Sequence, residues 1–285
     1  MVGLVSVLSV LLVAGSATRG AAQVVRATGQ NVVPVYEGWE RNPNGTFTMV
    51  FGYFNRNLEE EPFIPVGPNN MFEPGDADRG QPTHFYPRRQ QFMFRVPLPK
   101  DWGTKELVWT LSSHDRTEKA YGSLLPAWEI GQQVYEQNRS TTLLHRSDEP
   151  INQPPSITLL SAPQTTVKPQ ETVTLMVSVR DDGLPARSFR PRSTATATSA
   201  GQPASPMSQA VIRLDPTWRL GVIWIHHRGP GTVTIDPMRQ PITDGNAGQA
   251  VARASFSEPG THVLRAYADD GVLMDSVDVT VIVKK

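Results

Sequence analysis

Short runs of alternating apolar and polar side chains recur along this chain and restrict its fold more than any other feature. Residues 173–179, VTLMVSV, place four apolar side chains on one face of an extended strand: Val173, Leu175, Val177 and Val179. A period of two is typical of strands with one buried face. Similar runs occupy 156–160, 220–227, 232–235, 250–256, 261–268 and 276–283. About seven short strands separated by turn signals predict a β-sandwich, with Trp224 as its core tryptophan.

The first half of the chain shows the same period. Residues 46–54 place Phe47, Met49, Phe51 and Tyr53 on one face, and similar alternation follows around 92–96 and 107–111. Between these strands lies a stretch dense in Pro, Gly, Asn and Asp, which indicates turns. The 285 residues with 25 Pro and 22 Gly therefore predict an all-β fold of two immunoglobulin-like β-sandwich domains in tandem, at 24–130 and 156–285.

Two segments interrupt the strand pattern. Residues 131–155 are polar and end in Pro-Pro, which predicts an extended linker, with a short helix at 129–138 as the alternative. Residues 184–210 are rich in Ser, Thr, Ala, Pro and Arg, and we expect a disordered loop there because little apolar surface is available for burial.

The N-terminus has the pattern of an export signal. An apolar run covers Val2–Ala14, and the small residues Gly20, Ala21 and Ala22 follow it, so residues 1–22 are a predicted signal peptide cleaved after Ala22. No Lys or Arg precedes the run, and an uncleaved anchor or a buried segment are the alternatives. We expect a secreted, periplasmic or cell-surface protein with no membrane span after cleavage. The absence of cysteine excludes disulfides and favours a bacterial export product.

Charge and motifs restrict the function classes. The chain carries 27 Lys and Arg against 27 Asp and Glu, so it lacks the basic footprint of a nucleic-acid-binding protein. No Gly-x-Ser-x-Gly, His-Glu-x-x-His, phosphate-binding loop or EF-hand loop occurs. We expect a non-enzymatic structural or interaction protein, secreted or envelope-associated, whose partner is another envelope or extracellular protein or a polysaccharide.

Two alternatives stay open. A carbohydrate-binding accessory protein would expose several aromatic side chains on one face, and the candidates in the first domain are Tyr36, Trp39, Trp102 and Trp128. An extracytoplasmic hydrolase would need a pocket that brings a His beside an Asp and a Ser.

The second domain resembles a known group of modules. The segments ETVTLMVSVRDDGLP, LGVIWIHHRGPGTVTIDP and ARASFSEPGTHVLRAYADDGVLMDSVDVTVIV are similar to polycystic-kidney-disease-type and related immunoglobulin-like modules of bacterial secreted proteins. The first domain resembles a module of exported bacterial proteins. This resemblance implies a pair of extracytoplasmic sandwiches and brings no catalytic residue with it.

Two Asp-Asp-Gly runs suggest one metal site. In an immunoglobulin-like topology the second and sixth strands end at the same pole, beside the linker and the first domain. Four carboxylates would then gather there: Asp181, Asp182, Asp269 and Asp270. Calcium would relieve their repulsion, and it is the only cofactor that the residues suggest. The alternative is that these aspartates form ordinary turns.

Three other features have a simple structural interpretation. His226 and His227 are adjacent on a predicted strand and point to opposite faces, so we expect one half-buried and one solvated histidine. Asp76 and Asp78 in GDADRG indicate a turn, with calcium as the alternative. Tyr267 is expected on the outer face of the second sandwich or against a partner.

Overall fold

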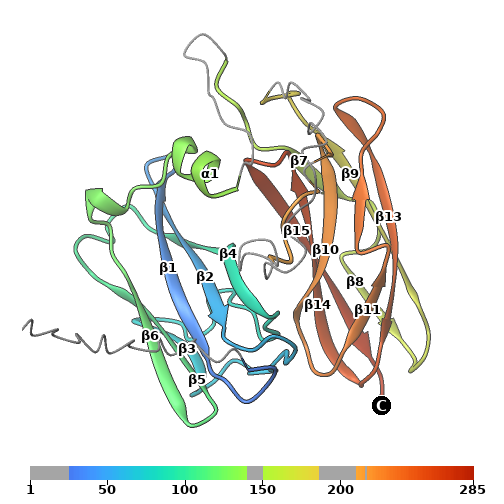
Figure 1. Ribbon diagram of the computed structural model, residues 1–285, viewed down its shortest axis with the longest axis horizontal. Coiled ribbons are helices and arrows are strands. Elements are labelled where there is room, and N and C mark those ends of the chain that lie inside the picture. Colours follow the sequence, from blue (N-terminus) through green and yellow to red (C-terminus); the bar gives the residue numbers. More distant parts are fainter. Residues whose placement is uncertain (1–25, 140–149, 186–209, 216) are drawn as a thin grey trace, which may run out of the picture.

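A computed structural model describes residues 26–139, 150–185, 210–215 and 217–285, and these residues form two β-sandwiches. The expected all-β fold is confirmed (Figure 1). The predicted signal peptide and most of the predicted loop at 184–210 lie outside the described residues.

The N-terminal sandwich consists of two antiparallel sheets of three strands each. One sheet has the order β1-β2-β4 and the other the order β3-β5-β6. The strands are β1 (Val32–Arg41), β2 (Phe47–Asn55), β3 (Asn70–Glu73), β4 (Arg88–Leu98), β5 (Leu107–Ser113) and β6 (Arg116–Gly122). Aromatic side chains fill the space between the sheets: Phe51, Phe72, Phe94 and Trp109 are buried and their rings contact one another.

The predicted linker begins as folded structure. A 3-10 turn η1 (Pro126–Trp128) is followed by the helix α1 (Gln132–Arg139), so the helical alternative at 129–138 describes this part of the chain better than an extended linker. The helix packs on the N-terminal sandwich because Tyr135 is buried and its ring contacts that of Phe92 at 4.7 Å.

The C-terminal sandwich has an immunoglobulin-like strand order. One sheet has the order β11-β13-β9-β7, which matches the ABED sheet of that fold. The other has the order β12-β10-β14-β15-β8, in which β10-β14-β15 match the CFG sheet and β12 and β8 add one strand at each edge. The strands are β7 (Ser156–Leu159), β8 (Gln164–Val167), β9 (Val173–Arg180), β10 (Gly221–Arg228), β11 (Val233–Asp236), β12 (Arg239–Pro241), β13 (Ala247–Phe256), β14 (Gly260–Asp269) and β15 (Met274–Val283).

The core of this second sandwich follows the predicted alternation. All four side chains predicted to face inward on β9 are buried, and Trp224 is 1% exposed within the same apolar cluster. Small alanines on β13 and β14 let the two sheets approach each other closely around the indole ring.

The two sandwiches share a further apolar layer. The outward-facing side chains Ile223, Ile225 and Tyr267 of the β10-β14-β15 sheet belong to the apolar cluster of the N-terminal sandwich, together with Met93 of β4. The four sheets therefore stack in sequence, with β1-β2-β4 packed against the immunoglobulin-like sheet that contains β10 (Figure 1). Within the described part of the chain, no helix is long and apolar enough to cross a membrane.

Candidate functional site

The interface between the two sandwiches contains buried polar groups that join distant parts of the chain. We define the domain interface as the contacts of β10, β14 and the turn after β14 with residues 78–93 and with Arg139 of α1. It has a histidine-rich end near Arg228, an apolar middle around Tyr267 and an acidic end near Asp269.

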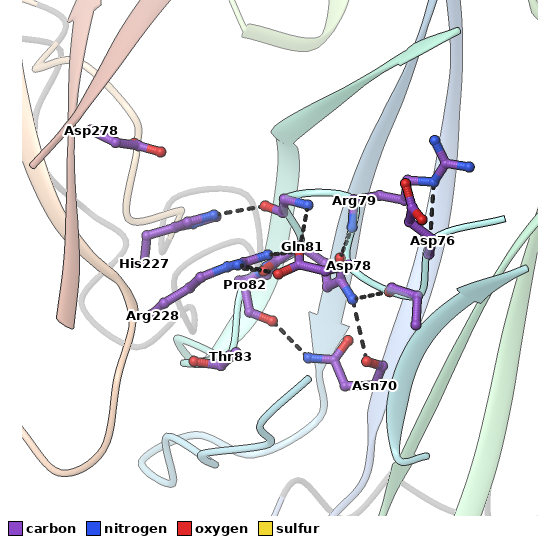
Figure 2. Close-up of polar contacts among 12 residues, drawn as sticks. Asn70, Asp76, Asp78, Arg79, Gln81, Pro82, Thr83, His227, Arg228 and Asp278 are labelled. Carbon is purple, nitrogen blue, oxygen red and sulfur yellow. Dashed lines mark hydrogen bonds and ion pairs between the residues drawn. The ribbon is translucent and has the colours of Figure 1, made fainter. Parts of the chain in front are cut away.

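Arg228, the last residue of β10, reaches across the interface to the N-terminal sandwich. Its guanidinium pairs with the carboxylate of Asp78 through two hydrogen bonds, Nη1 to Oδ2 at 2.9 Å and Nη2 to Oδ1 at 2.6 Å (Figure 2). Its Nε donates to the carbonyl oxygen of Gln81 at 2.7 Å. These bonds lower the pKa of Asp78, chiefly through the hydrogen bonds from Arg228. Asp78 was expected to act within a turn, but its main partner is Arg228 of the other sandwich.

Buried amides hold the loop that carries Asp78. The side chain of Asn70 donates to the carbonyl oxygens of Ile64 and Pro82 and accepts the indole N–H of Trp109. The amide of Gln81 donates to the carbonyl oxygens of Asn70 and Ala77 (Figure 2). These bonds hold the loop together and join it to Trp109 of β5, so the loop presents its carbonyl groups to β10 in a fixed position.

The backbone next to Arg228 completes this end of the interface. The ring Nε2 of His227 contacts the carbonyl oxygen of Gly80 at 2.9 Å (Figure 2). In return the backbone N–H of Thr83 donates to the carbonyl oxygen of His227 at 3.1 Å. The backbone N–H of His226 donates to the hydroxyl of Tyr86 at 2.9 Å.

Three histidines from both domains lie in ring contact at this end. The ring centroid of His226 is 4.6 Å from that of His84 in the N-terminal sandwich and 5.4 Å from that of His262 on β14. Nε2 of His84 lies 2.7 Å from Oε2 of Glu61. Among the described residues no group of three or more His, Cys, Asp or Glu is arranged to hold a metal ion.

The expectation of one half-buried and one solvated histidine at 226 and 227 was wrong. Both side chains are 1% exposed, because the N-terminal sandwich covers the face that would otherwise be in water. Desolvation lowers the pKa of His226 to about 3 and that of His227 well below its ordinary value. Both rings are therefore neutral at physiological pH.

The middle of the interface centres on Tyr267 and Arg265. The hydroxyl of Tyr267 donates to the carbonyl oxygen of Met93 at 2.5 Å, and Arg265 donates to the same oxygen at 3.4 Å while pairing with Asp278. The expected partner of Tyr267 is thus the other domain of the same chain.

At the acidic end, Arg139 connects α1 to the C-terminal sandwich. Its Nη2 lies 2.6 Å from Oδ2 of Asp269, and it also donates to the carbonyl oxygens of Val272 and Ile212. Both members of this ion pair are buried, with side-chain exposures of 9% and 0%.

Both Asp-Asp-Gly runs lie at this end, beside the linker, as their topology predicts. Consecutive linker residues contact one run each: Asn152 donates to Asp270 at 2.9 Å and the backbone N–H of Gln153 donates to Asp182 at 2.9 Å. Each of the four carboxylates accepts a hydrogen bond from the backbone N–H two residues further along the chain, as turn-forming aspartates do. Calcium at this end stays a prediction, and titration calorimetry tests it.

Burial changes the acidity of two of these carboxyl groups. Desolvation raises the pKa of Asp270 to about 7, against the opposing effect of hydrogen bonds from Asn152 and two backbone amides. Desolvation also raises the pKa of Asp181, whose Oδ1 is buried without a hydrogen-bond partner.

A cleft of about 440 Å³ opens beside α1 between the two domains. The polar side chains that line it are Glu40, Arg95, Gln132, Tyr135, Asn152, Asp275 and Ser276. The hydroxyl of Tyr135 donates to Glu40, which also pairs with Arg95 at 3.3 Å. The lining contains an Asp beside a Ser but no histidine, so it does not have the composition that the hydrolase alternative requires.

The aromatic candidates for carbohydrate binding differ in exposure. Trp39 and Trp102 are buried at 2% and 6%, and their indole N–H groups donate to backbone carbonyls. Trp128 is 48% exposed, and its ring lies 5.7 Å from the half-buried ring of Tyr36. A planar platform of four aromatic side chains is therefore absent, and one exposed indole remains.

Comparisons with known proteins give structural likeness only. No protein-family model matches the sequence, and no curated protein matches it. Among solved structures, the chain is similar to domains 4 and 5 of the S-layer protein SbsC, with a TM-score of 0.26 and 9% identity over 64% of this chain and 66% of that one, just under two thirds. It is similar to a domain of intimin, with a TM-score of 0.25 and 8% identity over 88% of this chain and 100% of that one. Likenesses at this level support no assignment of function.

Proposed function

We propose that the protein is an exported, non-catalytic interaction module of the cell envelope or the extracellular space, in which two sandwiches act as one rigid unit. The observation that carries the proposal is the domain interface, where Arg228, His227, Tyr267 and Arg139 each bond to the opposite domain or its helix. Tandem sandwiches joined in this way keep their outer surfaces at a fixed spacing, which suits a spacer or assembly subunit.

The chemistry of the interface supports a structural role. Its histidines and carboxylates are the groups that could act in catalysis, and several of them instead bond across the interface: His227 to the carbonyl oxygen of Gly80 and Asp269 to Arg139. Export is supported by the signal-like sequence of residues 1–22 and by the lack of cysteine in the chain. The partner we expect is another envelope or extracellular protein.

The experiment is affinity capture from envelope extract with the exported full chain, followed by titration of the purified partner against it. We expect saturable binding of the partner to the unsubstituted chain. The Asp275→Asn variant, which changes the cleft, should bind the same partner with the same affinity. Retention of the full chain in the cytoplasm after fractionation, or turnover of ester, peptide or glycoside reporters by the purified chain, would overturn the proposal.

A polysaccharide partner is the second candidate, because Trp128 is half exposed and flanked by the ion pair of Arg41 with Glu129 at 3.4 Å. An exposed indole stacks on the apolar face of a sugar ring, and neighbouring charged groups bond to its hydroxyls. Retardation in gels containing polysaccharide should be lost in Trp128→Ala and retained in Tyr121→Ala, whose ring is also exposed. Equal retardation of both variants and the unsubstituted chain excludes this candidate.

A further inference from the structure

We propose that the histidine-rich end of the domain interface is an acid-sensitive latch: protonation of buried His226 and His227 separates the two sandwiches, while neutral imidazoles hold them together. The proposal goes beyond the function above and does not depend on it. It follows from the hydrogen-bond arrangement of the rings, their burial and their position across the interface.

The arrangement of donors and acceptors at His262 fixes the proton on each ring. The ring Nε2 of His262 lies 3.1 Å from the carbonyl oxygen of Glu258, which can only accept, so this nitrogen carries the proton. The neutral His262 therefore has an unprotonated Nδ1, which lies 3.4 Å from Nε2 of His226. His226 consequently donates from Nε2, and its Nδ1 carries no proton.

A second proton has no acceptor at His226 or at His227. Nδ1 of both rings is buried without a hydrogen-bond partner, and Nε2 of His227 is committed to the carbonyl oxygen of Gly80. Protonation would create a buried N–H with nothing to accept it and a buried charge, both of which are costly. Water relieves that cost only if the rings leave their present environment.

The charged groups around the two histidines do not stabilise a protonated ring at its present position. The titratable and charged groups that face this end from the packed elements are Glu61, Asp78, His84, Tyr86, Arg228, Glu258, His262, Arg265, Tyr267 and Asp278. Arg265 and Arg228 further lower the pKa of His227. Asp78 pairs with Arg228 and Asp278 with Arg265, and Glu61 contacts His84. The remaining carboxylate, Glu258, favours the charged form of His262 and is not among the groups that shift the pKa of His226.

The rings lie where their displacement opens the interface. His226 and His227 bond through their own backbone to Tyr86 and Thr83 of the N-terminal sandwich, and His84 of that sandwich contacts the ring of His226. Movement of the end of β10 toward water thus removes the contacts to residues 80–86 together. The pKa of each histidine is lower in the closed form than in the open form. The open form therefore binds protons more readily, and a fall in pH below the ordinary histidine pKa shifts the equilibrium from closed to open.

The size of the effect follows from linkage. With an ordinary histidine pKa of about 6.5, each ring that stays neutral when closed raises the opening constant about 30-fold at pH 5. Two such rings give about 1,000-fold relative to pH 7.5. The opening constant rises as the pH falls below about 6.5. For His226 this rise ends near its pKa in the closed form, about 3.

The absence of cysteine makes a direct measurement simple. Lys119 on β6 and Arg253 on β13 are exposed on the two outermost sheets, about 30 Å apart if four sheets stack at the usual spacing. Fluorophores on cysteines at these two positions in the full chain report the separation of the domains by energy transfer. We expect high transfer at pH 7.5, a decrease between pH 6.5 and 4.5, and a circular dichroism spectrum that retains its β-sheet signal throughout.

The matched variants separate the latch from general acid sensitivity. Glutamine keeps a donor at the position of Nε2 and cannot be protonated, so H226Q/H227Q should lower the pH-dependent rise of the opening constant about 1,000-fold at pH 5. H114Q, at a partly exposed histidine outside the interface, should leave the response unchanged. Equal acid responses in H226Q/H227Q and the unsubstituted chain, or unchanged transfer down to pH 4.5, overturns the proposal.

Amide hydrogen exchange of the unsubstituted chain gives a second readout if the double variant does not fold. After correction for intrinsic rates, residues 80–86 and 222–228 should lose protection together at pH 5, while β9 keeps its protection. Loss of protection at the same pH in all strands would mean global unfolding and would contradict the latch.

Discussion

Arg228 and Asp78 lie 150 residues apart in the sequence and form a two-bond ion pair that joins the sandwiches. The two partners differ in burial, since the side chain of Arg228 is 21% exposed and that of Asp78 is 52% exposed. The arginine also bonds to the fully buried Gln81 at its carbonyl oxygen. The pair is therefore asymmetric, and removal of its two members should have different consequences.

The first prediction compares Arg228→Ala with Asp78→Ala. Loss of Arg228 leaves the buried carbonyl of Gln81 without its donor, which costs about 1–3 kcal/mol of the free energy of unfolding. Loss of Asp78 removes one exposed ion pair and costs about 0–1 kcal/mol. Urea denaturation at pH 7.5 measures both values. A larger loss in Asp78→Ala than in Arg228→Ala would show that the ion pair, and not the carbonyl contact, is the main stabilising interaction.

The second prediction concerns Asp270, whose pKa burial raises to about 7. Between about pH 4, the ordinary value, and pH 7 the folded state binds more protons than the unfolded state, so the free energy of unfolding falls as the pH rises. Asp270→Asn removes this dependence. Asn152 now donates to Asp270; when its amide turns over, its Oδ1, which has no partner in the structure, accepts from the new amide. We therefore expect stability at pH 8 to increase by at most about 4 kcal/mol.

Asp269→Asn is the matched control for that variant. The buried carboxylate of Asp269 pairs with Arg139, and its neutralisation leaves a buried guanidinium without a counter-charge, which costs about 3–5 kcal/mol. Thermal melting between pH 4 and pH 8 follows both variants. If Asp270→Asn lowered the melting temperature at pH 8 as much as Asp269→Asn, the carboxylate of Asp270 would be stabilising in its ionised form.

The third prediction concerns Gly229, which follows Arg228 with a φ of 129°. A Cβ at this position would lie 2.6 Å from Nδ1 of His262 and 2.9 Å from Nε2 of His226, so Gly229→Ala must displace the histidine pair. Gly67 has a φ of 151° and open space around its missing Cβ, so Gly67→Ala experiences backbone strain alone, about 1–3 kcal/mol. We expect Gly229→Ala to lose more stability than Gly67→Ala and to shift the His262 ring resonances in NMR spectra. Equal losses would show that the rings tolerate the methyl group.

The strands of the C-terminal sandwich could be predicted because each buries one face of regularly alternating side chains. On β9 every second residue from Val173 to Val179 is buried, and the residues between them are half-buried or exposed. In contrast, β12 covers only Arg239–Pro241 and is mostly polar, so it lacks any periodic signal. The helix α1 has few apolar residues, and its position depends on Tyr135 and on the tertiary contact of Arg139.

The domain interface left a signal in β10 that alternation alone does not capture. Val222 and Trp224 face the second core, while Ile223 and Ile225 between them face the other sandwich. A continuous apolar run is typical of a strand buried on both faces, and it predicts that the outer face of this sheet is covered. What covers it could not be predicted, because partners such as Asp78 and Gly80 lie in a loop whose composition indicates only turns.

The last prediction tests the second core at Trp224. The side chain is 1% exposed, and its indole N–H is buried without a hydrogen-bond partner. Trp224→Phe keeps most of the ring and removes the unpaired donor, so its cost should stay below that of Trp224→Ala, for which we expect about 3–5 kcal/mol. Trp128→Ala, at a half-exposed tryptophan, should change the free energy of unfolding by about 0.5 kcal/mol. Urea denaturation followed by circular dichroism measures all three. Truncation of a fully buried tryptophan leaves a cavity, and the alanines that line the two sheets are too small to fill it. A cost for Trp224→Ala no larger than that for Trp128→Ala would therefore contradict the position of Trp224 between the two sheets.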